Sequence, residues 1–360
     1  MKICTIVGAR PQFIKAASLS TELRRVHVEI LLHTGQHYDY EMSRVFFDEL
    51  SIPVPSYHLE IGSGSHGWQT GSMMASIEQV LLEEAPDCVL VIGDTNSTLA
   101  GALAAAKLGL RVGHVESGLR SYRRTMPEEI NRVLTDRLAT WLFCPTDVSV
   151  RNLAQEGITR GVWMTGDVLY DVLRETLPLA RAKSSTLAAF GVSERQFILA
   201  TLHRAENTDD RGRLSTFAHA LPKLGIPVVF PVHPRTSAAL KAAGLWEGLA
   251  RNAAVRLTGP VGYLDSLRLT EAALVAITDS GGLQREAHAL GIPCIVLREE
   301  TEWVETLEGG RTVLANGGLE QLPALVKRMA KAASFLPPME LGPKNGASRC
   351  IRQILEDTGA

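Results

Sequence analysis

The alternation of short, continuously apolar segments with longer segments of helical periodicity constrains this fold most. In the first half, the apolar segments lie at residues 3–7, 28–32, 89–92, 112–115 and 142–144. The helical patterns between them lie at residues 12–25, 70–84, 98–108 and 128–139. Strands without polar alternation are typical of a parallel sheet that is covered by helices on both faces. Short turns that contain glycine join the segments, so the pattern predicts βαβ units.

The same scheme begins again in the second half of the chain. Its apolar segments lie at residues 197–202, 228–230, 255–257, 274–278, 294–297 and 313–315. We therefore predict an α/β fold with two Rossmann-like, doubly wound domains that face a central cleft. The predicted domains are residues 1–168 and 169–343. A C-terminal helix within 344–360 is expected to pack back on the first domain.

Composition and charge exclude several classes of protein. The 360 residues carry 37 Lys and Arg against 39 Asp and Glu, a net charge of −2, which argues against a dedicated nucleic-acid binder. No run of about 18 apolar residues is present, so we expect no membrane-spanning helix. The apolar N-terminus is short and is interrupted by Arg10-Pro11. We therefore expect no signal peptide, and we expect a cytoplasmic protein.

Neither the cysteines nor the histidines form a metal-binding pattern. His33 and His37 are four residues apart, but Thr34-Gly35 between them indicates a loop rather than a helix. We expect no metal site, and we expect buried, reduced thiols at the five isolated cysteines, Cys4, Cys88, Cys144, Cys294 and Cys350.

The segment that follows the first strand carries two cations at the start of a helix. Residues 8–15 read Gly-Ala-Arg-Pro-Gln-Phe-Ile-Lys, which is not the GxGxxG fingerprint of dinucleotide binding. Gly8 permits a tight turn, and an anion near Arg10 and Lys15 would also interact favourably with the helix dipole. The alternative is that both are ordinary surface cations.

Acidic residues follow the next strands of the first half. Asp94 comes after one strand, although it could simply cap the following helix. Glu116 ends a buried strand, where a carboxylate is costly unless it is paired or functional. Glu128 opens a helix that also carries Arg132, and it could be a simple helix-start acid. Three acids at one edge of the sheet suit proton transfer at a carbon atom.

The second half places further polar residues at its strand ends. His203 and Arg204 follow its first strand, and His233 follows the next. Ser280-Gly281-Gly282 then joins a strand to a helix, and two glycines let a diphosphate approach the backbone N–H groups at a helix N-terminus. Glu286 is expected on the first turn of that helix, where it could bind ribose hydroxyls. The alternative is an ordinary glycine-rich turn.

These residues together carry a resemblance to a known family. In order along the chain come residues 8–15, Gly35-Gln36-His37, Gly93-Asp94-Thr95, residues 114–120 (HVESGLR), residues 127–132 (PEEINR), His203-Arg204 and Asp279-Ser280-Gly281-Gly282. The pattern resembles the non-hydrolysing UDP-N-acetylglucosamine 2-epimerases over nearly the whole chain. The resemblance implies the GT-B arrangement, a UDP-sugar substrate, no cofactor and a role in polysaccharide biosynthesis. We also expect a homodimer, with neither a nucleic-acid nor a membrane partner.

The resemblance implies a role for each candidate residue. The UDP contacts are matched by Ser280, Gly281, Gly282 and Glu286. The residues around the sugar and its leaving group are matched by Arg10, Lys15, Asp94, Glu116, Glu128 and His203. The family reverses C2 by eliminating UDP to give 2-acetamidoglucal and then adding UDP back. Asp94, Glu116 and Glu128 are then the acid and base candidates, and His203 is a further catalytic candidate that, with Arg10 and Lys15, would stabilise the charge of the departing UDP. Further candidate substrate contacts are Arg132, Arg204 and His233.

Departures from the family pattern leave the substrate open. Asp39 and Trp68 stand where many members carry an amide and an arginine for a second UDP-sugar. Residues 301–305 read TEWVE rather than TERPE. These features look like a branch that includes epimerases of UDP-2,3-diacetamido-2,3-dideoxyglucuronate. The hydrolysing relatives carry a His-Gly-Gly-type turn where this chain has Glu116-Ser117-Gly118, which favours the reversible reaction. A GT-B glycosyltransferase is the alternative from another class.

Overall fold

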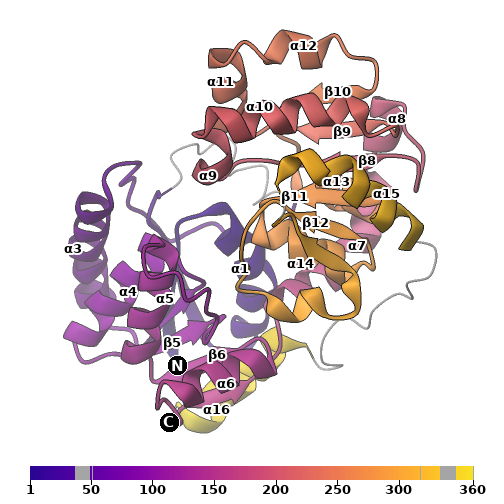
Figure 1. Ribbon diagram of the computed structural model, residues 1–360. Helices are drawn as coiled ribbons and strands as arrows, with labels where there is room; N and C mark the ends of the chain where they lie inside the picture. Colours follow the sequence, from indigo (N-terminus) through magenta and orange to yellow (C-terminus); the bar gives the residue numbers. More distant parts are fainter. Residues whose placement is uncertain (37–48, 51, 317, 333–345, 360) are drawn as a thin grey trace. The chain divides into compact units, whose positions relative to one another are not determined.

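The computed structural model describes residues 1–36, 49–50, 52–316, 318–332 and 346–359. The chain divides into two compact units, one of residues 1–174 with 341–360 and the other of residues 175–340 (Figure 1). This division falls within helix α7 (Val168–Lys183). The predicted boundary at residue 168 coincides with the first residue of that helix, and the one at 343 lies outside the described residues.

The first unit is built on a parallel sheet with helices in the crossovers. Its described strands pair in the order β3-β2-β1-β4-β5-β6-β7. They are β1 (Lys2–Val7), β2 (Val28–His33), β3 (Tyr57–His58), β4 (Cys88–Ile92), β5 (Arg111–Val115), β6 (Trp141–Cys144) and β7 (Val162–Met164). Besides the start of α7, the helices are α1 (Arg10–Leu23), α3 (His66–Glu84), α4 (Asn96–Lys107), α5 (Pro127–Leu138), α6 (Asp147–Gln155) and α16 (Ala347–Thr358).

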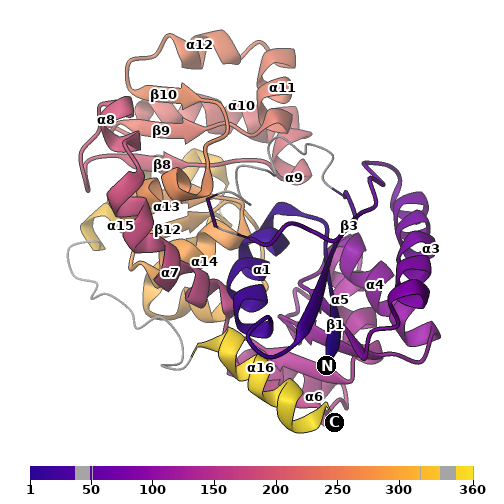
Figure 2. The same ribbon diagram turned by 180° about the vertical axis from the view of Figure 1, so that it is seen from behind.

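Both faces of this sheet are covered by apolar helix faces, as the continuously apolar strands predict. Ile3 and Val7 of β1 pack in one cluster with α1 and α16. Cys4 and Ile6, which point to the opposite face, pack in another with α3 and α4. Helix α16 lies along α1 (Figure 2), where Arg352 pairs with Glu22. The C-terminal residues thereby become part of the first unit.

The second unit repeats the parallel design. Its described strands pair in the order β10-β9-β8-β11-β12-β13. They are β8 (Ile198–Ala200), β9 (Val228–Pro231), β10 (Val255–Thr258), β11 (Val275–Thr278), β12 (Cys294–Val296) and β13 (Thr312–Leu314). The α-helices after α7 are α8 (Thr186–Phe190), α9 (Ala205–Thr208), α10 (Arg211–Ala220), α11 (Pro234–Ala242), α12 (Trp246–Ala250), α13 (Tyr263–Ala272), α14 (Gly281–Ala289) and α15 (Leu322–Ala332). Short 3-10 turns are η1 (Leu221–Lys223), η2 (Val304–Gly310) and η3 (Leu319–Gln321).

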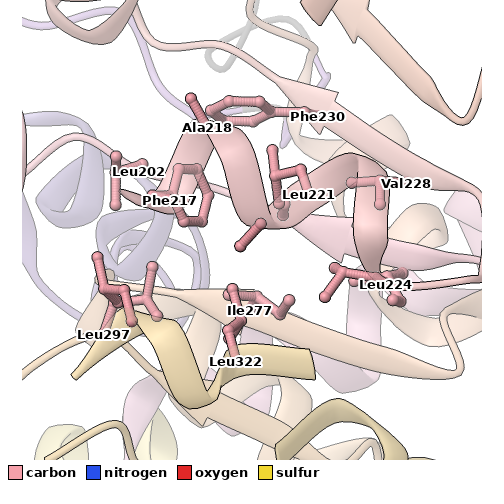
Figure 3. Packing of buried hydrophobic residues seen from close by; sticks show 14 of the residues in the cluster. Leu202, Phe217, Ala218, Leu221, Leu224, Val228, Phe230, Ile277, Leu297 and Leu322 are labelled. Atoms are coloured by element: carbon pink, nitrogen blue, oxygen red, sulfur yellow. The ribbon is translucent and has the colours of Figure 1, made fainter. Parts of the chain in front are cut away.

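One hydrophobic cluster of the second unit is packed between its sheet and the helices α10 and α15, and another lies between the sheet and the helices α13 and α14. Figure 3 shows Phe217 of α10, Phe230 of β9, Ile277 of β11 and Leu322 of α15 converging in one cluster. Phe217 meets Phe230 edge to face, with the ring centroids 5.7 Å apart. The predicted fold class, α/β with two doubly wound parallel sheets, is confirmed.

In each sheet the direction in which successive strands are added reverses at one position, and this position is of interest at the carboxyl edge of the sheet. In the first unit the chain winds outward from β1 through β2 and β3, then returns to place β4 on the other side of β1. In the second unit the same reversal lies between β8 and β11. Ligands of doubly wound sheets bind at such reversals. No described helix has both the length and the apolar character that a membrane span requires.

Candidate functional site

Gln12 joins the turn after β1 to the end of β4. Its Oε1 accepts hydrogen bonds from the backbone N–H groups of Gly8 (2.8 Å) and Ala9 (2.9 Å). Its Nε2 donates to the Ile92 carbonyl (2.7 Å). The sequence analysis passed over this residue, although glutamine at the third helical position is a capping pattern. Gly8 is needed for close packing, because a Cβ there would lie 2.1 Å from the Thr34 hydroxyl.

Lys15 and Glu116 form a buried ion pair at this edge of the sheet. Each side chain is 7% exposed. Glu116 has a φ of 77°, in the left-handed region that costs a non-glycine residue free energy. A Cβ on Gly93 would be 3.4 Å from the Glu116 carboxylate and 3.7 Å from the Lys15 amine. The pair therefore lies beside the turn that follows β4, and Lys15 is no ordinary surface cation.

Asp94 pairs with Arg132 instead of capping helix α4. Its Oδ2 accepts from the Arg132 Nε (3.0 Å) and from a terminal guanidinium nitrogen (2.7 Å). Thr95 supplies the cap, because its hydroxyl accepts from the Thr98 backbone N–H (3.3 Å). Asn131 adds a hydrogen bond to the Asp94 carbonyl (2.9 Å). The turn after β4 is thus held by α5.

The two neighbouring acids at the start of α5 differ in their contacts. Glu129 is buried and accepts from Arg132 (2.6 Å) and from the backbone N–H groups of Ser121 (2.9 Å) and Tyr122 (2.8 Å). Glu128 is half-buried, and its side chain makes no hydrogen bond or ion pair with another described residue. Glu129 therefore holds the loop before α5, whereas the Glu128 carboxylate is available to a ligand. Arg10, the first residue of α1, is also half-buried.

A buried histidine–aspartate pair connects the turns after β4 and β5. The His114 ring contacts the Gly93 carbonyl through Nε2 (2.7 Å) and Asp136 through Nδ1 (2.6 Å). Asp136 also accepts from the Ser117 hydroxyl (2.6 Å) and from Arg120 (2.7 Å). Burial opposes ionisation of Asp136, but the charges and hydrogen bonds of its partners, His114 first, lower its pKa below the ordinary value. The sequence analysis did not single out this pair.

In the second unit, a similar pair joins β8 to β11. Asp279 follows β11, and its Oδ1 lies 2.9 Å from the His203 Nδ1. Its carboxylate also accepts from the backbone N–H groups of His203 (3.0 Å) and Arg204 (2.9 Å) and from the Asn207 amide (3.0 Å). Burial opposes ionisation, but these hydrogen bonds, led by that of His203, lower the pKa of Asp279 to about 2.

The other two polar residues predicted at these strand ends lie in the same region of the second unit. The ring of His233, after β9, has its centroid 5.6 Å from that of His203. His233 also caps α11, because its Nδ1 accepts from the Arg235 backbone N–H (3.2 Å). Arg204 is half-buried immediately before α9. The β8 and β9 ends thus bring together two imidazole rings and a guanidinium-bearing residue.

The Ser280-Gly281-Gly282 turn opens helix α14 as predicted. The Ser280 hydroxyl caps it by accepting from the Leu283 backbone N–H (3.4 Å). The prediction for Glu286 is wrong in one respect. Because α14 begins at Gly281, Glu286 lies on its second turn, where the side chain is buried. Burial together with the charge and hydrogen bond of Glu286 raises the pKa of the Tyr263 phenol well above its ordinary value.

The remaining predicted positions fall into two groups. His37 and Asp39 lie outside the described residues. Trp68 is exposed on the first turn of α3, and Trp303 is buried with the Arg285 guanidinium 3.9 Å from its ring centroid. Among the residues that the structure describes, no three His, Cys, Asp or Glu side chains are grouped as metal ligands.

Comparison with known proteins adds independent information. A family model described as UDP-N-acetylglucosamine 2-epimerase matches residues 21–354. A Methanococcus maripaludis protein named UDP-N-acetylglucosamine 2-epimerase homolog is 52% identical, covering 89% of this chain and 90% of its own. A Pseudomonas aeruginosa protein named UDP-2,3-diacetamido-2,3-dideoxy-D-glucuronate 2-epimerase is 47% identical, with the same coverages of 89% and 90%. The crystal structure of Methanocaldococcus jannaschii UDP-GlcNAc 2-epimerase in complex with UDP-GlcNAc and UDP matches with a TM-score of 0.92 and 40% identity. It covers 99% of this chain and 100% of that one.

Proposed function

Because this chain belongs to the UDP-N-acetylglucosamine 2-epimerase family, we propose that it interconverts UDP-N-acetylglucosamine and UDP-N-acetylmannosamine. The observation that carries the proposal is the pair of carboxylates at the β1/β4 reversal, Asp94 and Glu116, together with Glu128 one turn before Arg132 on α5. Glu116 is paired with Lys15, Asp94 with Arg132, and Glu128 is left with no described partner. Two carboxylates held by cations and one that is available to a ligand are groups of the kind that proton transfer at a carbon atom uses.

The proposed reaction exchanges a proton and a leaving group at adjacent carbons. A carboxylate removes the C2 proton, the C1–O bond breaks, and UDP departs with the bonding electrons to leave a C1–C2 double bond. In the reverse sense, UDP oxygen bonds to C1 while C2 is protonated on its opposite face. The atoms and electrons balance without an external oxidant or reductant. This is consistent with the lack of a GxGxxG fingerprint after β1.

We assign the sugar chemistry to residues of the first unit. Asp94, Glu116 and Glu128 are the acid and base candidates, and Arg10, Lys15 and Arg132 are the cations that balance charge on the departing UDP. Which carboxylate removes the proton stays open. Lys15 is already buried in its ion pair with Glu116. The Lys15 amine can therefore interact with a ligand anion as well as with Glu116 without a further loss of hydration.

We assign UDP binding to residues of the second unit. The N-terminus of α14, with Ser280, Gly281 and Gly282, offers backbone N–H groups and the positive end of the helix dipole to the diphosphate. Glu286 is assigned to the ribose, and His203, Arg204 and His233 to the phosphates. The predicted homodimer and cytoplasmic location stay predictions.

Proton NMR of UDP-N-acetylglucosamine with enzyme in heavy water tests the reaction. We expect deuterium at C2 of both epimers, with no acceptor and no nicotinamide cofactor added. A glycosyltransferase would leave the UDP-sugar unchanged without an acceptor. Retention of the C2 proton through turnover would rule out the elimination route.

Glu128→Gln separates chemistry from folding. Because Glu128 has no described partner, the variant should keep its melting temperature while turnover falls by about 10²–10⁴-fold. Glu83→Gln is the matched control, since it removes an exposed acid of α3 in the same unit. If Glu128→Gln turns over as fast as Glu83→Gln, Glu128 has no part in the chemistry.

The Pseudomonas relative makes a second substrate worth testing in parallel. Its name specifies a sugar with a second acetamido group and a carboxylate at C6. Specificity constants for that sugar nucleotide and for UDP-N-acetylglucosamine, measured on one enzyme preparation, decide between them. We expect the higher value for UDP-N-acetylglucosamine, and a higher value for the uronate would transfer the same proposed chemistry to that substrate.

A further inference from the structure

The two histidine–aspartate pairs described above differ in whether both ring nitrogens of the histidine have hydrogen-bond partners. His114 is fully buried, and both of its ring nitrogens have partners, Asp136 and the Gly93 carbonyl. The His203 side chain is 38% exposed, and only its Nδ1 has a hydrogen-bond partner among the described residues, namely Asp279. The first ring can only brace the fold, whereas the second presents its Nε2 to a ligand.

We propose that Asp279 is the positioning residue for His203, holding its ring with Nδ1–H toward the carboxylate and Nε2 toward the UDP-sugar. This inference rests on the proposed function, because the ligand that meets Nε2 is taken to be the diphosphate of the leaving group. Asp279 itself is fully buried, so in this proposal it acts on the substrate only through His203.

The hydrogen-bond donors around Asp279 determine which ring nitrogen of His203 carries the proton. Its carboxylate accepts from two backbone N–H groups and from the Asn207 amide, so three donors besides His203 hold it in the ionised form. An ionised carboxylate can only accept, and therefore the His203 Nδ1 must donate. The parallel pairing of β8 with β11, which sets Ala200 against Ile277, brings the two residues together at the strand reversal.

This arrangement places an imidazole ring, oriented by a carboxylate, where negative charge would develop in the proposed reaction. A carboxylate behind an imidazole stabilises the imidazolium, and the imidazolium can offer Nε2–H to the departing diphosphate. Other charged or titratable groups face this region. They are the His233 ring at 5.6 Å, Arg204 and Glu206 next to His203 in sequence, the Arg235–Asp209 pair between α11 and the end of α9, and Arg213 of α10, which donates to Asn207.

Nitrogen-15 NMR of histidine-labelled enzyme reads the ring state directly. The His203 signals are assigned by their loss in His203→Gln, and their pH titration is followed without substrate. We expect the neutral form to carry its proton on Nδ1. A neutral ring protonated on Nε2 in the wild-type enzyme would overturn the proposal, whatever the enzyme's activity.

Asp279→Asn tests the catalytic consequence. The amide oxygen can still accept from the His203 and Arg204 backbones, but its NH₂ group must donate to Nδ1 and so moves the proton to Nε2. We expect turnover to fall by about 10²–10⁴-fold near neutral pH, with a smaller loss in more acidic buffer, because an imidazolium carries N–H on both ring nitrogens in either protein. UDP affinity should change by less than about threefold.

Thr201→Val is the control for a merely structural effect. It breaks the 2.6 Å hydroxyl contact between Thr201 and Thr278, which joins the same two strands, and leaves His203 and Asp279 intact. We expect no change in the ring state and a pH-independent effect on turnover. A pH-independent loss in Asp279→Asn would likewise reduce Asp279 to a structural role. If the wild-type enzyme epimerises no UDP-sugar, the proposed function fails while the NMR result still stands.

Discussion

At the residue scale, the two glycines at the start of α14 differ in how much space the surrounding protein atoms leave for a side chain. A Cβ on Gly281 would lie 3.0 Å from the Glu302 carboxylate, so its own neighbours restrict that position. A Cβ on Gly282 would meet only the Ser280 hydroxyl, at 3.7 Å. The protein's own atoms therefore leave room for a side chain at position 282, and we expect that a requirement for glycine there would come from a ligand.

Gly282→Ala should consequently separate stability from binding. Alanine is the better helix former by about 0.5–1 kcal/mol, so the melting temperature should hold or rise. UDP affinity should fall by about tenfold or more, about 1.4 kcal/mol, because the methyl group obstructs the diphosphate. Calorimetric titration with UDP measures this. Gly248→Ala is the control, since that α12 glycine has open space around it. Equal UDP affinities in the two variants would show that the diphosphate binds elsewhere.

At the element scale, the C-terminal helix depends on a cap from another helix. Gly346 precedes α16 with a φ of 78° and a ψ of 146°, a conformation that only glycine adopts readily. Since glycine has no capping side chain, Asp171 of α7 accepts from the Ser348 backbone N–H instead (2.7 Å). Burial raises the pKa of Asp171. The Asp171 carboxylate thus loses favourable hydration free energy on burial, and in that buried position it fixes the start of α16.

Gly346→Ala should loosen this junction. Its Cβ would lie 2.9 Å from the Asp171 carboxylate and would also be strained by the backbone conformation. We expect a loss of about 1–3 kcal/mol in the free energy of unfolding. Gly157→Ala, at a φ of 76° in open space, carries backbone strain without the clash. Denaturant unfolding should rank Gly346→Ala below Gly157→Ala, and equal losses would mean that the Asp171 contact is unimportant.

At the scale of the whole molecule, buried titratable groups govern how stability changes with pH. His288 of α14 is buried, and its Nδ1 has no hydrogen-bond partner among the described residues. Burial, and then the charge of Arg311, lower its pKa from the ordinary value of 6.5. The unfolded chain therefore binds this proton more tightly than the folded one. The contribution of His288 is present above pH 6.5 and is lost as the pH falls through its folded pKa.

His288→Gln should flatten this part of the pH dependence. A single proton can change stability by at most about 1.4 kcal/mol per pH unit, so the wild-type melting temperature should decrease more steeply than the variant's below about pH 6.5. Melting curves from about pH 8 to 5 measure the difference. His219→Gln, which removes an exposed histidine of α10, should leave the wild-type slope unchanged. If His288→Gln keeps that slope as well, another group is responsible.

Local pattern was sufficient for the central strands of both sheets and for the strand ends at which to look for the site. Continuously apolar strands and helical periodicity depend on near neighbours in sequence, so they can be recognised without knowledge of the tertiary structure. The short strand β7 was missed, because two of its three residues are exposed and its sequence carries no buried run. The carboxyl ends of the strands did contain Glu116, Asp94 and His203, since a parallel sheet collects those ends at one edge.

The sequence by itself thus determined the α/β class, the two parallel sheets and the residues at their edges. Only the tertiary structure decided the partners. Lys15 meets Glu116 across 101 residues, and Asp94 meets Arg132 rather than the helix beside it. Asp279 reaches His203 because β11 lies next to β8. Strand order and the pairing of residues far apart in sequence depend on the topology of the folded chain. The same local pattern of strands and helices is compatible with several topologies.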